Sequence, residues 1–173
     1  GMSDRLRLDL VLNDFVACAI SSGKIEILSD GSPWRPLIDV EDMSRIILWA
    51  CKREASDGGQ FLTVNAGKSE WNYQVKDLAE AVASQVPRCN LLINTNARPD
   101  KRSYKVDFSL FESLAPAFLP RVSLDESISR LINGLQGMNF SSENFRETEF
   151  MRLKILKRLQ AENTINNDLR WIV

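Results

Sequence analysis

The residue types that most often carry catalysis are sparse in this sequence. Histidine is absent, which removes the usual general base near neutral pH, the commonest metal ligand and every histidine-based triad. The three cysteines, Cys18, Cys51 and Cys89, are far apart and have no metal-ligand spacing. Cys18 and Cys51 lie among apolar residues at helical spacing, where a free thiol behaves as a small hydrophobic group. We therefore expect no metal site and no Ser/Cys-His chemistry.

Bulk composition excludes further classes. The chain has 173 residues, 44% of them hydrophobic, which suffices for one ordinary domain with a core. The 22 Lys and Arg residues nearly balance the 23 Asp and Glu residues. The net charge therefore gives no general electrostatic reason to expect binding to nucleic acid or to an anionic membrane. No apolar run reaches membrane-span length, and the N-terminus lacks a signal-peptide layout. We expect a cytoplasmic protein. Gly1 before Met2 is typical of a cleaved tag, so we expect the native frame to begin at Met2.

The elements that must position any site follow from periodicity and turn chemistry. Helical spacing predicts helices over 8–22, 42–53, 72–86, 107–114, 123–137 and 145–162. Short β patterns predict extended segments over 25–28, 36–40, 61–65, 91–94 and 103–106. The turn over 29–32 suggests that the first two form a hairpin-like excursion.

Cap residues support these helices. Asp42, Asn72 and Asp107 are expected to cap helix N-termini, and Ser123 with Glu126 has the spacing of a capping box. Gly23 stands where a left-handed residue would end the first helix. The whole pattern predicts a small mixed α/β unit over 1–137, followed by a C-terminal amphipathic helical extension over 138–173. The cationic face of that extension is expected to be solvated and its apolar face to contact a partner.

Several segments, taken together in order and spacing, resemble a known family. They are residues 7–13 (RLDLVLN), 22–27 (SGKIEI), 30–42 (DGSPWRPLIDVED), 61–67 (FLTVNAG) and 98–102 (RPDKR). They are similar to the extended short-chain dehydrogenase/reductase family, of the NAD-dependent nucleotide-sugar epimerase/dehydratase type. The similarity covers the chain from about Leu8 to Gly137. It departs locally at Asp39, where the family often has histidine.

Two features of that family are missing. The sequence has no glycine-rich turn after an opening strand, and no Tyr-x-x-x-Lys pair, since Asp77 follows Tyr73 and Phe108 follows Tyr104 at the fourth position. The resemblance therefore implies the C-terminal, substrate-binding half of such an enzyme, without the Rossmann domain. On this hypothesis the chain binds no cofactor, although the complete family uses NAD(P). It also contains no catalytic residue and is inactive alone.

The resemblance also implies a ligand, a nucleotide diphosphate-sugar. Arg35 and Arg102 would contact its diphosphate or ribose, because a guanidinium donates paired hydrogen bonds and stays charged. The alternative for each is a surface arginine paired with a nearby acid. Asn13 would donate its amide to a phosphate oxygen or to the nucleotide, or else be a solvated helix residue.

Further candidate ligand contacts follow from the same resemblance. The backbone of the segment that includes Lys24, Ile25 and Ile27 would grip the nucleobase, and Trp34 could line the sugar or base site. Asn65 is as well explained by the turn at 66–67 as by ligand contact.

Two functions remain open at this point. One is a substrate-binding half that acts with a separate Rossmann half. The other is a non-catalytic oligomerising or partner-binding module left by gene truncation. A third possibility is that the cellular protein extends beyond Met2 and has the family's full enzymology. Loss of a domain would expose apolar surface, so we expect self-association as a homo-oligomer.

Overall fold

The computed structural model describes residues 1–97 and 102–172. It is a mixed α/β structure, as the sequence predicts, and it contains one small parallel and one small antiparallel sheet. Its main elements are α1 (Val11–Ser22), β1 (Lys24–Ile27), β2 (Trp34–Pro36), α2 (Val40–Lys52), β3 (Asn72–Gln74), α3 (Val75–Gln85), β4 (Asn90–Ile93), α4 (Ser109–Leu114), α5 (Leu124–Gly137) and α6 (Arg152–Ala161). Short 3-10 turns lie at Ser69–Trp71, Pro116–Phe118 and Phe145–Glu147.

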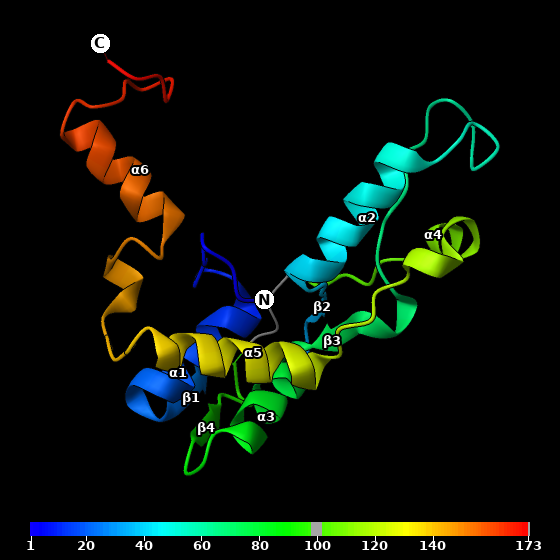
Figure 1. The fold of residues 1–173 in the computed structure, drawn as a ribbon. Helices are drawn as coiled ribbons and strands as arrows, with labels where there is room; N and C mark the ends of the chain where they lie inside the picture. Colours follow the sequence, from blue (N-terminus) through cyan, green and yellow to red (C-terminus); the bar gives the residue numbers. More distant parts are fainter. Residues whose placement is uncertain (98–101, 173) are drawn as a thin grey trace.

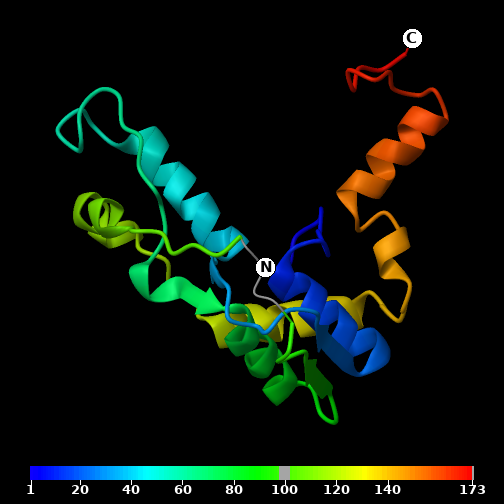
Figure 2. The same cartoon turned by 180° about the vertical axis from the view of Figure 1, so that it is seen from behind.

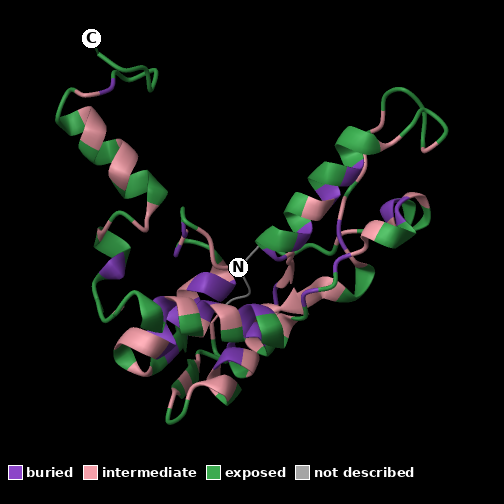
Figure 3. Cartoon of the chain, viewed as in Figure 1, coloured by how far each residue is buried: buried purple, intermediate pink, exposed green. Residues whose placement is uncertain are grey.

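A base and two projecting helices make up the shape (Figure 1). The base contains α1, α3 and α5 with the β1–β4 sheet, and α2 and α6 diverge from it in both views (Figures 1 and 2). Burial is concentrated in the base, whereas α6 is mostly exposed (Figure 3). No helix in the described part of the chain is long and apolar enough to cross a membrane.

The base holds the main hydrophobic core. Most of its fully buried members come from α1, β1, α3 and α5, and include Val16, Ile25, Val82 and Leu131. The predicted first helix is confirmed as α1, and Gly23 ends it in the left-handed conformation at φ 63°. The predicted strands over 25–28 and 91–94 are confirmed within a residue as β1 and β4, which pair in parallel.

The predicted hairpin of the first two extended segments is wrong. The turn itself forms, since Asp30 Oδ1 accepts from the Ser32 amide at 3.1 Å. The chain does not fold back, however, because the turn binds the start of α3 through the Gly31 and Pro33 carbonyls. Consequently β2 pairs with β3 in antiparallel fashion, with Arg35 opposite Tyr73.

Helix α2 begins earlier than its predicted cap. Asp39 is the N-cap, and its Oδ1 accepts from the Glu41 amide at 3.0 Å. Asp42 is therefore not a cap but a buried residue of the first turn. Its Oδ2 accepts from the amides of Arg121 and Val122 at 2.9 and 2.8 Å, which fastens α2 to the segment before α5.

The predicted strand over 61–65 does not form. Residues 62–66 have no regular structure, and the 61–66 backbone makes no hydrogen bond with other backbone groups in the described ranges. The alternation is nonetheless real, since Leu62, Val64 and Ala66 pack against Ile46, Trp49 and Phe111, while Phe61 is 87% exposed. A β pattern becomes a strand only when a neighbouring strand supplies ladder partners.

The remaining helices confirm their predicted type and correct some termini. Gln74 and Asp77, not Asn72, form the capping box of α3, because Asn72 lies in β3 and its side chain exchanges hydrogen bonds with Val106. Ser123 caps α5 as predicted, whereas the Glu126 carboxylate binds Arg130 instead of closing a reciprocal box.

The predicted helix over 145–162 is divided. It contains a 3-10 turn at Phe145–Glu147 and the shorter helix α6.

Asp107 is the predicted cap of the helix over 107–114. Its Oδ1 accepts from the Ser109 amide at 2.9 Å, at the start of α4.

Candidate functional site

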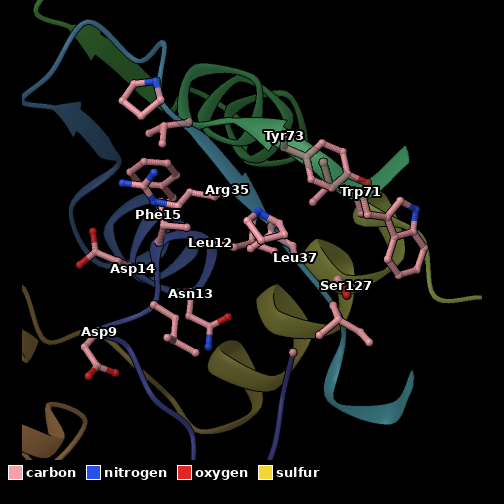
Figure 4. Close-up of a pocket in the computed structure, with 18 of the residues that line it drawn as sticks. Asp9, Leu12, Asn13, Asp14, Phe15, Arg35, Leu37, Trp71, Tyr73 and Ser127 are labelled. Atoms are coloured by element: carbon pink, nitrogen blue, oxygen red, sulfur yellow. The ribbon is translucent and has the colours of Figure 1, made fainter. Parts of the chain in front are cut away.

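A cavity of about 900 Å³ opens between the base and the start of α2. It is lined by the first half of α1, the end of β1, the segment from β2 to Asp39, β3 and the start of α5 (Figure 4). Its lining is mainly apolar with a few polar groups, which is the usual character of a small-molecule site, and its volume lies in the range of such sites.

Arg35 lies in this cavity wall beside a second arginine. Its Nη1 donates to the Trp34 carbonyl at 2.7 Å and also to the carbonyl of Arg102. The guanidinium carbon of Arg35 is 5.8 Å from the ring centroid of Tyr104. Arg35, Arg102 and Tyr104 all line the cavity. The structure thus brings the two arginines that the sequence singles out together at the wall of this cavity.

Asn13 lines the same cavity and is buried. Its amide nitrogen donates to the Arg7 carbonyl at 2.8 Å, so the side chain also orders the segment that precedes α1. The predicted ligand contact of Asn13 stays a prediction.

The predicted nucleobase segment reaches the cavity only at its end. Ile27 lines it, whereas Ile25 is fully buried in the core and Lys24 pairs with Glu26 at 2.9 Å on the surface. The β1–β4 ladder occupies this segment's edge. The proposed base contact through Lys24, Ile25 and Ile27 stays a prediction.

Two further predicted contacts lie outside the cavity lining. Trp34 stacks under Lys105, whose Nζ is 3.7 Å from the ring centroid, and Asn65 is exposed. Of the predicted loop over 98–102, residues 98–101 lie outside the described residues, and only Arg102 is placed.

Sequence reasoning missed several residues that line the cavity. They are aromatic or polar and come from five separate segments: Phe15, Asp39, Trp71, Tyr73, Tyr104 and Ser127. The sequence held a partial signal for Tyr73. Strands and helices alternate along this chain, and a short strand over 72–74 directly before a helix would fit that alternation. No periodicity could show that this strand pairs with β2 and sets Tyr73 opposite Arg35 (Figure 4).

The ionisable groups of the cavity have distinct surroundings. Burial, and then the charges of Asp125 and Glu70, raise the pKa of Tyr73, so its hydroxyl stays neutral as a donor and acceptor at physiological pH. A hydrogen bond from Arg7 lowers the pKa of Asp9. Asp14 is held by Arg146 through two bonds of 3.0 and 2.8 Å.

These features limit the chemistry of the site. Within residues 1–97 and 102–172, no group of three or more metal-ligating side chains is gathered. Nor does a glycine-rich turn precede a helix N-terminus in those ranges, so these residues do not fit the usual pyrophosphate cradle of a dinucleotide. The arginines instead suit binding of an anionic group, and the aromatic side chains suit a ring or sugar face.

Comparison with known proteins agrees with this architecture. Residues 5–67 match the NAD dependent epimerase/dehydratase family. The chain is similar to an NAD dependent NDP-hexosamine 5,6-dehydratase, TunA, involved in tunicamycin biosynthesis, with a TM-score of 0.61 and 16% identity over 76% of this chain and 41% of that one. The predicted epimerase/dehydratase resemblance is thus supported by a family match.

Two other solved structures are similar to a comparable extent. A monomeric L-threonine 3-dehydrogenase from a metagenome gives a TM-score of 0.54 at 15% identity, over 75% of this chain and 42% of that one. RMD from Pseudomonas aeruginosa, complexed with NADPH, gives 0.55 at 16%, over 76% and 44%. Such identities show the fold alone. The chain spans less than half the length of these structures.

The comparisons overturn one expectation. The sequence led us to expect that this chain binds no cofactor. The family that matches residues 5–67 is NAD dependent, and a similar structure contains NADPH. The matched region lies in the N-terminal part of the chain, so the expectation of a chain without a cofactor is wrong. Missing glycine-rich and Tyr-x-x-x-Lys motifs were an insufficient basis for it.

Proposed function

We propose that this chain forms the nucleotide-sugar-binding part of an NAD-dependent epimerase/dehydratase-like enzyme, with the cavity beside Arg35 as the binding site. The single observation that carries the proposal is the hydrogen bond from the Arg35 guanidinium to the backbone carbonyl of Arg102, at the wall of a cavity of about 900 Å³ that both residues line. The family match at residues 5–67 supports the same function. NAD(P), when bound, carries hydride in reactions of this class.

The cavity residues would divide the ligand by chemistry. The arginine end would bind the diphosphate, since guanidinium groups recognise phosphate oxygens through forked, charge-assisted bonds. Phe15 and Tyr104 both line the cavity, where a ring could stack. The apolar stretch around Leu37, together with Trp71, would exclude water from the sugar.

The test is calorimetric titration of the chain with UDP and UDP-glucose. We expect Arg35→Ala to weaken UDP binding about tenfold to a hundredfold, because a hydrogen bond to a charged group contributes about 1.5–3 kcal/mol. Arg158→Ala is the matched control, since it removes the same charge from α6, outside the cavity. Equal affinity of the two variants for UDP would contradict the proposed site.

A non-catalytic association module is the second candidate. It is favoured by exposed apolar residues on one side of α2, namely Val40, Met43 and Ile47, since soluble proteins rarely leave a large apolar patch uncovered. The same titration separates the candidates. A module of this kind would bind neither UDP nor UDP-glucose, and its self-association would not change with Arg35→Ala.

A further inference from the structure

Residues 61–66 have the burial pattern of a strand, and their backbone has no partner strand. Leu62, Val64 and Ala66 are partly buried, while the three residues that alternate with them are exposed. In the described ranges, the 61–66 backbone makes no hydrogen bond with another backbone group. The segment runs back alongside α2 toward β3 (Figure 1). Its inner face is therefore covered by its own chain, but its edge is open.

Nothing in the sequence of this segment protects the open edge. Strand edges that stay in solvent usually have lysine, proline or an inward-pointing charge, which prevents pairing with another chain. The stretch from Gln60 to Gly67, QFLTVNAG, has no charged residue and no proline. Thr63 and Val64 are β-branched, which favours a strand. A neutral, unprotected edge is a place where another polypeptide adds a strand.

Helix α2 has an exposed apolar stripe beside the face that covers this segment. Ile46 and Trp49 pack in the cluster that Leu62 and Val64 join. Ile47 lies about 100° round the helix from Ile46, and it forms the exposed stripe with Val40 and Met43. A strand added on this flank, about 4.8 Å from 61–66, would lie against the stripe. One partner would thus complete the backbone ladder and cover the apolar side chains.

The segment is complementary to itself. Residues directly opposite each other in an antiparallel pair share a face, so self-pairing keeps the apolar face on one side when Thr63 or Val64 lies opposite its own copy. Gly67 is buried, and a Cβ there would come within 2.6 Å of the Phe108 ring. The ladder therefore ends before Gly67, and Thr63 is the middle of the 60–66 stretch that is left.

This register brings the two α2 helices together. Leu62 then lies opposite Val64 of the second copy, and both copies of α2 cover the same face of the new ladder. Packed helices lie 8–10 Å apart, so the two stripes can face each other across the twofold axis. A second copy therefore accounts for the open edge and for the exposed stripe at the same time.

We propose that the chain forms a twofold dimer in which the 61–66 segments pair as antiparallel strands and the α2 stripes pack together. Such an interface uses the same surface on both copies and closes on itself. The segment brings no charge into it. The dimer goes beyond the proposed function and does not depend on ligand binding, so UDP titration and association are separate readouts.

Sedimentation equilibrium from about 1 to about 100 µM tests the association. We expect the unmodified chain to dimerise in this range. Ile47→Lys should weaken the dimer at least about tenfold, because it places like charges against each other in a desolvated interface. Leu153→Lys is the matched control, since Leu153 is 61% exposed on α6 and Ile47 is 58% exposed. It should leave association unchanged, and thermal unfolding reports whether each variant folds.

Charge exchange at Thr63 tests the pairing of the segment with its own copy. Thr63→Lys and Thr63→Glu should each weaken the dimer alone, because like charges then lie opposite each other, and an equimolar mixture should restore it. A monomer at every concentration, equal association of Ile47→Lys and Leu153→Lys, or a Thr63 mixture no more associated than its components would overturn the inference. The proposed function would stand in each of these cases.

Discussion

Helices α2 and α6 both project from the base, but they are held in different ways (Figures 1 and 3). Ile46 and Trp49 of α2 are buried against Phe111 and Ala115, and the buried Asp42 ties its first turn to Arg121 and Val122. Helix α6 has no buried residue.

The attachment of α6 is instead made by the segment before it. Phe140 contacts Phe145 and Phe150 with ring centroids 5.8 and 5.7 Å apart, and Arg146 pairs with Asp14 of α1. Both helices are amphipathic in sequence, so amphipathicity does not decide whether a helix is anchored. A distant segment that covers its apolar face does, together with buried polar groups that fix its angle.

Among the substitutions that test this difference between α2 and α6, we expect the largest loss of stability at Phe111. Phe111→Ala removes a fully buried ring that meets Trp49 edge to face at 5.3 Å. We expect a loss of about 3 kcal/mol of unfolding free energy for the α2–α4 region, measured by hydrogen exchange of α2 amides. Leu153→Ala on α6 is the control, where exposed apolar truncation should cost less than about 0.5 kcal/mol. Similar losses for both variants would remove the distinction between the arms.

We expect a smaller loss of stability at the buried carboxylate of Asp42. Asp42→Asn replaces one accepting oxygen by an NH2 donor. The side chain is 1% exposed, and its two oxygens accept from two backbone amides and from Arg45. We expect about 2 kcal/mol of destabilisation, the cost of a buried donor left unpaired. Chemical denaturation followed by tryptophan fluorescence measures it. A stability unchanged within error would show that these bonds do not hold α2 to the base.

The smallest effect is expected at the anchor of the C-terminal arm. Arg146→Ala removes the ion pair with Asp14. The Arg146 side chain is 53% exposed and the Asp14 side chain is 22% exposed. Exposed ion pairs contribute about 0.2–1 kcal/mol, so we expect about 0.5 kcal/mol at low salt and less at high salt. Thermal unfolding at two salt concentrations measures this. A salt-independent loss above about 2 kcal/mol would mean that α6 is anchored as firmly as α2.

Local pattern was sufficient for several elements. The α1 helix with its Gly23 end, the short strands β1 and β4, and the span of α5 depend on neighbouring residues, since helical periodicity, a left-handed glycine and a serine cap act within a few residues. The sequence also singled out the two arginines, because their segments resemble a family, and their contact with a ligand stays a prediction.

Local pattern failed where a choice depended on distant partners. Asp39 and Asp42 are equally good caps by composition, and only the amides of Arg121 and Val122 decide that Asp42 turns inward. The segment over 61–65 has a strand pattern but no backbone ladder in the described part of the chain. The cofactor expectation failed for a related reason, since it treated missing motifs as proof of an absent function.

The sequence by itself determined the class of the chain, a small mixed α/β protein without histidine chemistry, and the arginines available for an anionic ligand. Only the tertiary structure decided that Tyr73 lies opposite Arg35 in the β2–β3 ladder, that Ser127 meets Asp39 across 88 positions, and that these groups share one cavity. The physical reason is range. Propensity and capping act over a few residues, whereas strand pairing and the burial of a carboxylate depend on contacts between segments that the chain brings together only on folding.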